Sequence, residues 1–185
     1  VTASDDGKVR LCDIRSFRPV CRIATFADPA TAIAFMANGD VVSAGTDGMV
    51  RRSLGDTLAT VVKVDVAQDV VSALLPRAGG LDEVDVVSLD GMVAAVDLSP
   101  VPAAESRLSQ FRECPSVRSR QLYQYCRAGS SLAAPSGNGV CFVAEDGAVT
   151  DDSNRHQGSN VTTVAFYGER SCIVTGAEDG TVTLG

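Results

Sequence analysis

An Asp-Gly pair between two extended runs recurs five times along these 185 residues. The runs are VTASDDGKVRLCDI at 1–14, VVSAGTDGMVRRSL at 41–54, VDVVSLDGMVAAVDL at 84–98, VCFVAEDGAVTDD at 140–152 and CIVTGAEDGTVTLG at 172–185. Asp-Gly is among the strongest hairpin signals because the tight turn needs a positive φ, which glycine adopts without steric cost. A valine follows two positions after each glycine and fixes one face of the second strand. The repetition predicts a chain of similar antiparallel sheets.

Further extended runs complete these units. ATAIAF at 30–35, VVSALL at 70–75 and VTTVAF at 161–166 precede hairpins, while PVCRIATF at 19–26 and TLATVVKV at 57–64 follow them. Each full unit therefore has four short strands, and the expected fold is all-β. The exception is 99–130, which is richer in Pro, Ser and Arg. It is expected to be a loop or insertion between repeats, with a short helix around 104–112 as an option and a partner-binding role as the alternative.

Composition narrows the classes of function. The formal net charge is −7 and arginines cluster only locally, so no broad basic face is expected for nucleic acid. The six cysteines contain no C-x-x-C pair and the chain has one histidine, which argues against a structural zinc site and favours a reducing compartment. No apolar run reaches the length of a membrane span and no signal peptide opens the chain, so an intracellular location, cytoplasmic or nuclear, is expected.

Three stretches resemble the WD-repeat β-propeller family, with degenerate repeats that lack the tryptophan: ASDDGKVRLCDIR, ATAIAFMANGDVVSAGTDGMVRRSL and VTTVAFYGERSCIVTGAEDGTVTLG. The resemblance implies a β-propeller of four-stranded antiparallel blades. About four to five blades are represented, in approximate repeats 1–26, 27–65, 66–98, 131–157 and 158–185. Because the first and last units are partial and the chain opens at Val1 without Met, we expect part of a larger propeller of about seven blades.

In WD repeats a hydrogen-bonded set links a His, a Ser or Thr, the turn Asp and the Trp. Here a Ser or Thr stands four residues before three of the turn aspartates, His156 alone can take the His role, and the Trp position holds Cys12, Ser53, Val96, Asp152 or Gly185. The resemblance thus assigns structural roles to Thr2, Asp6, Gly7, Cys12, Asp13, Ser43, Asp47, Gly48, Asp90, Gly91, Asp97, Asp146, Gly147, His156, Thr175, Asp179 and Gly180.

No constellation in the sequence predicts catalysis. The turn aspartates lack the alternating oxygen ligands of a calcium loop, and His156 has no orienting partner or nucleophile elbow beside Ser153 or Ser159. We therefore expect no enzyme activity, cofactor, metal or small-molecule substrate. Arg51-Arg52 resembles in outline the paired arginines of phosphoinositide-binding propellers, but the flanking Phe and Gly are missing.

The resemblance favours a non-catalytic protein–protein interaction scaffold, a WD-repeat subunit of a larger eukaryotic multiprotein assembly. The alternative is a substrate receptor of a cullin-RING ubiquitin ligase, because Cys12 to Arg15 (CDIR) looks like a W-D-x-R adaptor-docking box with Cys for Trp. A phosphoinositide-binding propeller is less favoured. Proteins are the expected partners, without nucleic acid or membrane insertion. Candidate partner contacts are Arg15, Phe111, Arg112, Tyr123, Tyr125 and Arg127.

Overall fold

The structure, a computed structural model, describes residues 1–77, 82–100, 108–113, 125–128, 131–144, 146, 148–152, 155–167 and 172–185, giving only the backbone for 108–113. The chain consists of two compact units, Val1–Phe111 and Arg112–Gly185. Every regular element in the described ranges is a β-strand, and no helix there has the length and apolarity to cross a membrane. These strands confirm the all-β prediction.

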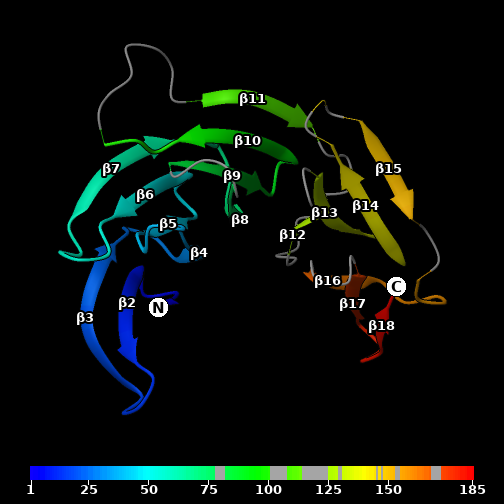
Figure 1. Cartoon of the computed structure of the whole chain (residues 1–185), viewed down its shortest axis with the longest axis horizontal. Helices are drawn as coiled ribbons and strands as arrows, with labels where there is room; N and C mark the ends of the chain where they lie inside the picture. Colours follow the sequence, from blue (N-terminus) through cyan, green and yellow to red (C-terminus); the bar gives the residue numbers. More distant parts are fainter. Residues whose placement is uncertain are drawn as a thin grey trace. The chain divides into compact units, whose positions relative to one another are not determined.

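The first unit contains three antiparallel sheets that follow one another in chain order (Figure 1). The first sheet has the order β1-β2-β3, the second β4-β5-β6-β7 and the third β11-β10-β9-β8. Their strands are β1 (Thr2–Ala3), β2 (Lys8–Asp13), β3 (Arg18–Thr25), β4 (Ala30–Phe35), β5 (Val41–Gly45), β6 (Met49–Ser53), β7 (Thr60–Asp65), β8 (Val71–Pro76), β9 (Glu83–Ser88), β10 (Met92–Asp97) and β11 (Leu108–Glu113). β11 ends just beyond the boundary between the units.

The second unit contains a four-stranded sheet, β12-β13-β14-β15, and a three-stranded sheet, β16-β17-β18. Their strands are β12 (Cys126–Ala128), β13 (Ser131–Ser136), β14 (Gly139–Val143), β15 (Val149–Asp152), β16 (Val161–Tyr167), β17 (Cys172–Ala177) and β18 (Val182–Leu184). Ala133 and Val140 of the first of these sheets pack with Val161, Val164 and Ile173 of the second.

Small and β-branched side chains form the interior of the first unit. Val9, Ile23 and Ala24 of the first sheet pack with Ala30 and Val41 of the second. A larger cluster, centred on fully buried valines such as Val42, Val50, Val71 and Val84, joins the second sheet to the third. Val and Ala bring sheets close together, and burial of their methyl groups supplies the main driving force for the packing.

Turn glycines adopt the positive φ that the sequence indicated. Gly7 and Gly48 have φ of 70°, and each donates its N–H to the carbonyl three residues earlier. A Cβ on Gly48 would lie 1.8 Å from the Ala67 carbonyl oxygen, so both the backbone angle and the close approach require glycine there.

The segment 99–130 holds two strands in its described part, where the sequence indicated a loop or insertion. β11 is the outer strand of the third sheet and β12 the first strand of the fourth. Since Leu108–Glu113 is extended, the option of a short helix around 104–112 does not hold for those residues. The remainder lies outside the described residues, so the repeat boundaries and a binding role for this segment stay predictions.

Candidate functional site

The five turn aspartates perform one shared task. In every hairpin the Oδ1 atom of the aspartate accepts the backbone N–H two residues further on, which closes the turn. The N···O distances are 3.0 Å for Lys8–Asp6, 3.1 Å for Met49–Asp47, 2.9 Å for Met92–Asp90, 2.9 Å for Ala148–Asp146 and 2.8 Å for Thr181–Asp179. Among the described residues, no three His, Cys, Asp or Glu side chains gather closely enough to hold a metal ion.

Asp13 and Asp97, which end the third strands of their repeats, cap the next turn. Asp13 accepts the Arg15 N–H at 2.8 Å and the Ser16 hydroxyl at 3.1 Å. Asp97 accepts the N–H and the hydroxyl of Ser99 at 2.8 and 3.1 Å. The hydrogen bond from the Arg15 backbone lowers the pKa of Asp13. Both carboxylates therefore serve the backbone.

His156 is the centre of a polar network in the last sheet. Its ring is 3% exposed. Nε2 lies 2.9 Å from Thr175 Oγ1 and 3.2 Å from Thr183 Oγ1, and Nδ1 lies 2.7 Å from Thr181 Oγ1. Thr181 donates its hydroxyl to Asp179 Oδ1 at 2.6 Å.

The carboxylate sets the direction of this network. Because Thr181 gives its hydrogen to Asp179, its oxygen accepts Nδ1–H from His156. In the neutral imidazole, Nε2 then accepts from Thr175, whose oxygen in turn accepts from Thr183 at 2.7 Å. The Thr181 hydroxyl also lowers the pKa of Asp179. Sequence reasoning selected His156, Thr175 and Asp179 but missed Thr181 and Thr183, for which the Thr-Val-Thr run after Asp-Gly was the available signal.

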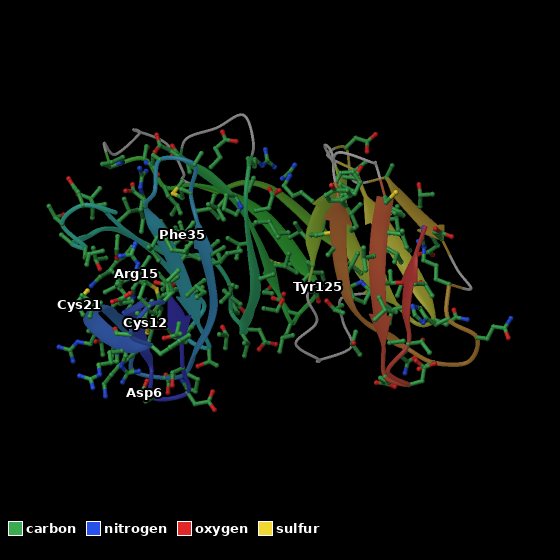
Figure 2. All side chains as sticks on the ribbon, turned by 60° about the horizontal axis from the view of Figure 1, so that its bottom comes forward. Asp6, Cys12, Arg15, Cys21, Phe35 and Tyr125 are labelled. Atoms are coloured by element: carbon green, nitrogen blue, oxygen red, sulfur yellow. The ribbon has the colours of Figure 1, made fainter. Side chains whose placement is uncertain are left out.

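In the first sheet, the side chains at the family's Ser/Thr, Asp and Trp positions make different contacts. Thr2 Oγ1 lies 3.9 Å from Cys12 Sγ, so a weak sulfur contact stands where the family has an indole. Asp6 forms an ion pair with Arg10, which lowers the pKa of the Asp6 carboxyl. Asp6 lies just before β2 and Arg15 just after it, and Figure 2 shows the two well apart.

In the second sheet Ser43 is 1% exposed, and its hydroxyl has no hydrogen-bond partner among the described residues. Ser53, at the Trp position, lies 3.2 Å from the Thr60 hydroxyl instead. Arg51, directly opposite Ser43 in the β5–β6 register, lies 3.5 Å from Asp47 and 3.8 Å from the centre of the Phe26 ring.

Arg52 is buried between the second and third sheets. Its Nε donates to Asp40 at 2.8 Å, while Nη1 donates to Asp82 and, at 2.9 Å, to the Leu98 carbonyl. Asp40 also accepts the Gly55 N–H at 2.8 Å, so the depression beside this pair is lined by groups that already have partners. With Arg51 and Arg52 both engaged internally, the phosphoinositide hypothesis loses the two side chains on which it rested.

The candidate partner contacts belong to different elements of the chain. Arg15 is exposed at the β2–β3 turn, and Arg127 is half-buried in β12. Tyr125 is only 7% exposed, so its ring offers little surface for a partner. Phe111 and Arg112 lie in β11, of which only the backbone is described. Tyr123 and, among the structural positions, Gly147 lie outside the described residues.

Comparisons with known proteins agree on the fold. Residues 152–184 match the family model "WD domain, G-beta repeat". The crystal structure of the WD40 β-propeller domain of Doa1 is similar over 98% of this chain and 58% of that one, with 13% identity and a TM-score of 0.75. The computationally designed Ika8 protein matches over 98% of this chain and 53% of its own, with 21% identity and a TM-score of 0.66. The designed Ika4 protein matches over 86% and 92%, with 21% identity and a TM-score of 0.60. No curated protein matches the sequence.

Proposed function

We propose that this chain, a member of the WD-repeat β-propeller family, is a non-catalytic scaffold within a larger eukaryotic multiprotein assembly. WD40 propellers commonly bind other proteins and as a family are generally non-catalytic. The chain spans 58% of the Doa1 domain, so the partners and activity of a whole protein are part of the proposal.

The observation that carries the proposal is the placement of His156. It is the chain's one histidine, and it is buried with both ring nitrogens bonded to threonine hydroxyls. The turn aspartates close hairpins, and Arg52 and Asp40 bond to each other. These side chains stabilise the sheets, which leaves surface recognition as the function that the geometry supports.

Purification of the chain under native conditions tests the proposal. We expect a fixed set of proteins to co-elute with it in constant ratio through size-exclusion chromatography. His156→Ala should reduce the amount of co-eluting protein only in proportion to the fraction of the chain that it unfolds. Elution as a single species without partners, or turnover of a substrate that His156→Ala abolishes while the fold stays intact, would contradict a scaffold.

The second candidate is the adaptor-docking role in a cullin-RING ubiquitin ligase. It is favoured by Arg15, which is exposed just after the capped turn residue Asp13. Arg15→Ala should remove the ligase adaptor from the purified complex, whereas Arg10→Ala, which changes an arginine already paired with Asp6, should not. Retention of the adaptor by Arg15→Ala excludes this role.

The location belongs to the same proposal. Cys12, Cys21 and Cys126 are free thiols, which suits a reducing compartment. A cytoplasmic or nuclear signal from the tagged protein in cells is the expected result, and secretion would contradict it.

A further inference from the structure

The turn between β2 and β3 exposes apolar side chains to an unusual degree. Ile14 is 82% exposed, Phe17 88% and Val20 63%. We call residues 14–22 the arginine–apolar tip, because Arg15, Arg18 and Arg22 lie among them and are also exposed. Scattered single apolar residues on a surface need no explanation, but three strongly exposed ones within seven residues of sequence are a denser group than that.

The backbone at Phe17 makes the exposure more informative. Phe17 has φ of 54°, in the left-handed region that bulky residues rarely adopt. Leu58, at the matching place before β7, has φ of 59° but is half-buried and packs against the core between the first and second sheets. At Leu58 burial offsets the unfavourable backbone. Phe17 is not buried against the described chain, so nothing there offsets its unfavourable φ. An outlier of this kind is a reason to look for a binding role.

The tip carries three arginines that have no ion-pair partner in the described ranges. Arg10, Arg51, Arg52, Arg77 and Arg155 each form an ion pair with a carboxylate. Arg15, Arg18 and Arg22 form no ion pair within the described residues, and no acidic residue occurs between Asp13 and Asp28. The tip contributes three positive charges to a chain of net charge −7, so the residues outside it sum to −10.

We propose that the arginine–apolar tip binds a short acidic segment of a partner protein. The segment carries an apolar or aromatic side chain that packs on Ile14 and Phe17, and carboxylates that pair with Arg15, Arg18 and Arg22. This inference rests on the proposed scaffold function and names the chemistry of one partner.

Charge complementarity favours a short peptide over an extended polyanion. Screening at physiological salt confines electrostatic attraction to about 8 Å, so a short segment interacts with the tip alone. A nucleic acid or an anionic membrane reaches beyond the tip, onto the remainder of a chain whose residues outside the tip carry a formal net charge of −10.

The test uses a fluorescein-labelled peptide, Gly-Asp-Glu-Leu-Asp-Glu-Phe-Asp-Gly, titrated with the full chain and followed by fluorescence anisotropy. A second peptide with Asn and Gln in place of Asp and Glu is the control for charge. We expect saturable binding of the acidic peptide, weakened at least about tenfold by Phe17→Ser and by Arg15→Glu with Arg18→Glu. Lys63→Glu, which reverses an exposed charge on β7, should leave the affinity within about twofold.

Leu58→Ser separates binding from folding. It should lower the urea midpoint of the chain and leave peptide affinity unchanged. Phe17→Ser should leave the urea midpoint unchanged and lower peptide affinity. A urea midpoint lowered by Phe17→Ser as much as by Leu58→Ser would overturn the proposal, because Phe17 would then be packed by the protein's own chain.

Other occupants give distinct results that also overturn it. Self-association that disappears in Phe17→Ser points to a second copy, and Phe17-dependent binding to phosphatidylserine vesicles points to a membrane. If no peptide binds at about 1 mM while native partners survive Phe17→Ser and Arg15→Glu, the tip proposal fails and the scaffold function stands. Absence of any native partner removes the scaffold function itself.

Discussion

The second and last sheets share one hairpin but fill its polar core in different ways. Three residues after the turn glycine, the second sheet has Arg51 and the last has Thr183. Arg51 lies near Asp47 and over the Phe26 ring, and the Ser43 hydroxyl opposite it has no partner in the described part of the chain. Thr183 joins Thr175 in a chain of hydroxyls and imidazole that ends on Asp179.

This difference shows that the hairpin turn forms independently of the side-chain network behind it. Both hairpins keep the contact between Asp Oδ1 and the N–H two residues on, although the buried hydroxyls of Ser43 and Thr175 have different surroundings. The turn therefore depends on Asp and Gly alone, and the polar core contributes stability that varies between sheets. This explains how these hairpins form in a chain that contains no tryptophan.

The largest expected contrast is between the two turn glycines. Gly48→Ala forces a Cβ against the Ala67 carbonyl oxygen at a φ of 70°. Around Gly180, with φ of 80°, no atom of the described residues other than its chain neighbours lies within 4 Å of an added Cβ. We expect Gly48→Ala to cost about 3 kcal/mol or more and Gly180→Ala about 1 kcal/mol. Hydrogen exchange of strand amides in each sheet measures both, and equal losses would show that the close approach at Gly48 is unimportant.

His156→Ala breaks the network of the last sheet. It leaves the buried Thr175 hydroxyl without its acceptor and opens a cavity, so we expect a loss of about 2–4 kcal/mol. Arg51→Ala in the second sheet should cost about 1 kcal/mol, since the hairpin there does not depend on a completed network. Chemical denaturation followed by a probe in each unit compares them. A larger loss for Arg51→Ala would reverse the ranking of the two cores.

Much of the fold could be predicted because its signals are local. Asp-Gly fixes a turn within four residues, and alternating valines fix a strand face within six, so the hairpins needed no distant information. β11 and β12 were missed because Pro, Ser and Arg in 99–130 weaken the strand pattern, and pairing with a neighbouring strand overrides it.

The site residues that escaped prediction depend on partners far along the chain. Nothing near Arg52 indicates burial, which rests on Asp82 and the Leu98 carbonyl of another sheet. The sequence around Phe17 and Tyr125 likewise does not indicate that the first is exposed and the second buried. The family pattern could place His156 beside Thr175, but Cys12 and Arg51 show that equivalent positions take different roles.

Ser43 and Thr175 occupy equivalent positions and should respond differently to loss of their hydroxyls. Thr175→Val removes a buried donor to His156 and should cost about 1–2 kcal/mol. Ser43→Ala removes a buried hydroxyl for which the described ranges offer no partner, so stability should be unchanged or increased by up to about 1 kcal/mol. Urea midpoints of the two variants decide the matter. Destabilisation by Ser43→Ala similar to that of Thr175→Val would mean that a bound water completes the second network.

The smallest expected effect concerns how the stability of the first and last sheets falls at low pH. Arg10 lowers the pKa of Asp6, and the Thr181 hydroxyl lowers the pKa of Asp179. A carboxyl whose pKa is depressed by folding stabilises the fold above its unfolded pKa of about 3.9, and that contribution is lost as the pH falls through the folded pKa. Both sheets should therefore weaken only below about pH 4.

Salt distinguishes the two causes. NMR titration of the side-chain carboxyl carbons should show the pKa of Asp6 rising toward its ordinary value in about 1 M NaCl, because salt screens an exposed ion pair. The same rise is expected in Arg10→Met, which removes the pair. The pKa of Asp179 should rise in Thr181→Val and respond little to salt, because a hydroxyl carries no net charge. An equal salt response at both aspartates would mean that long-range charge, and not the local donor, holds the Asp179 carboxylate ionised.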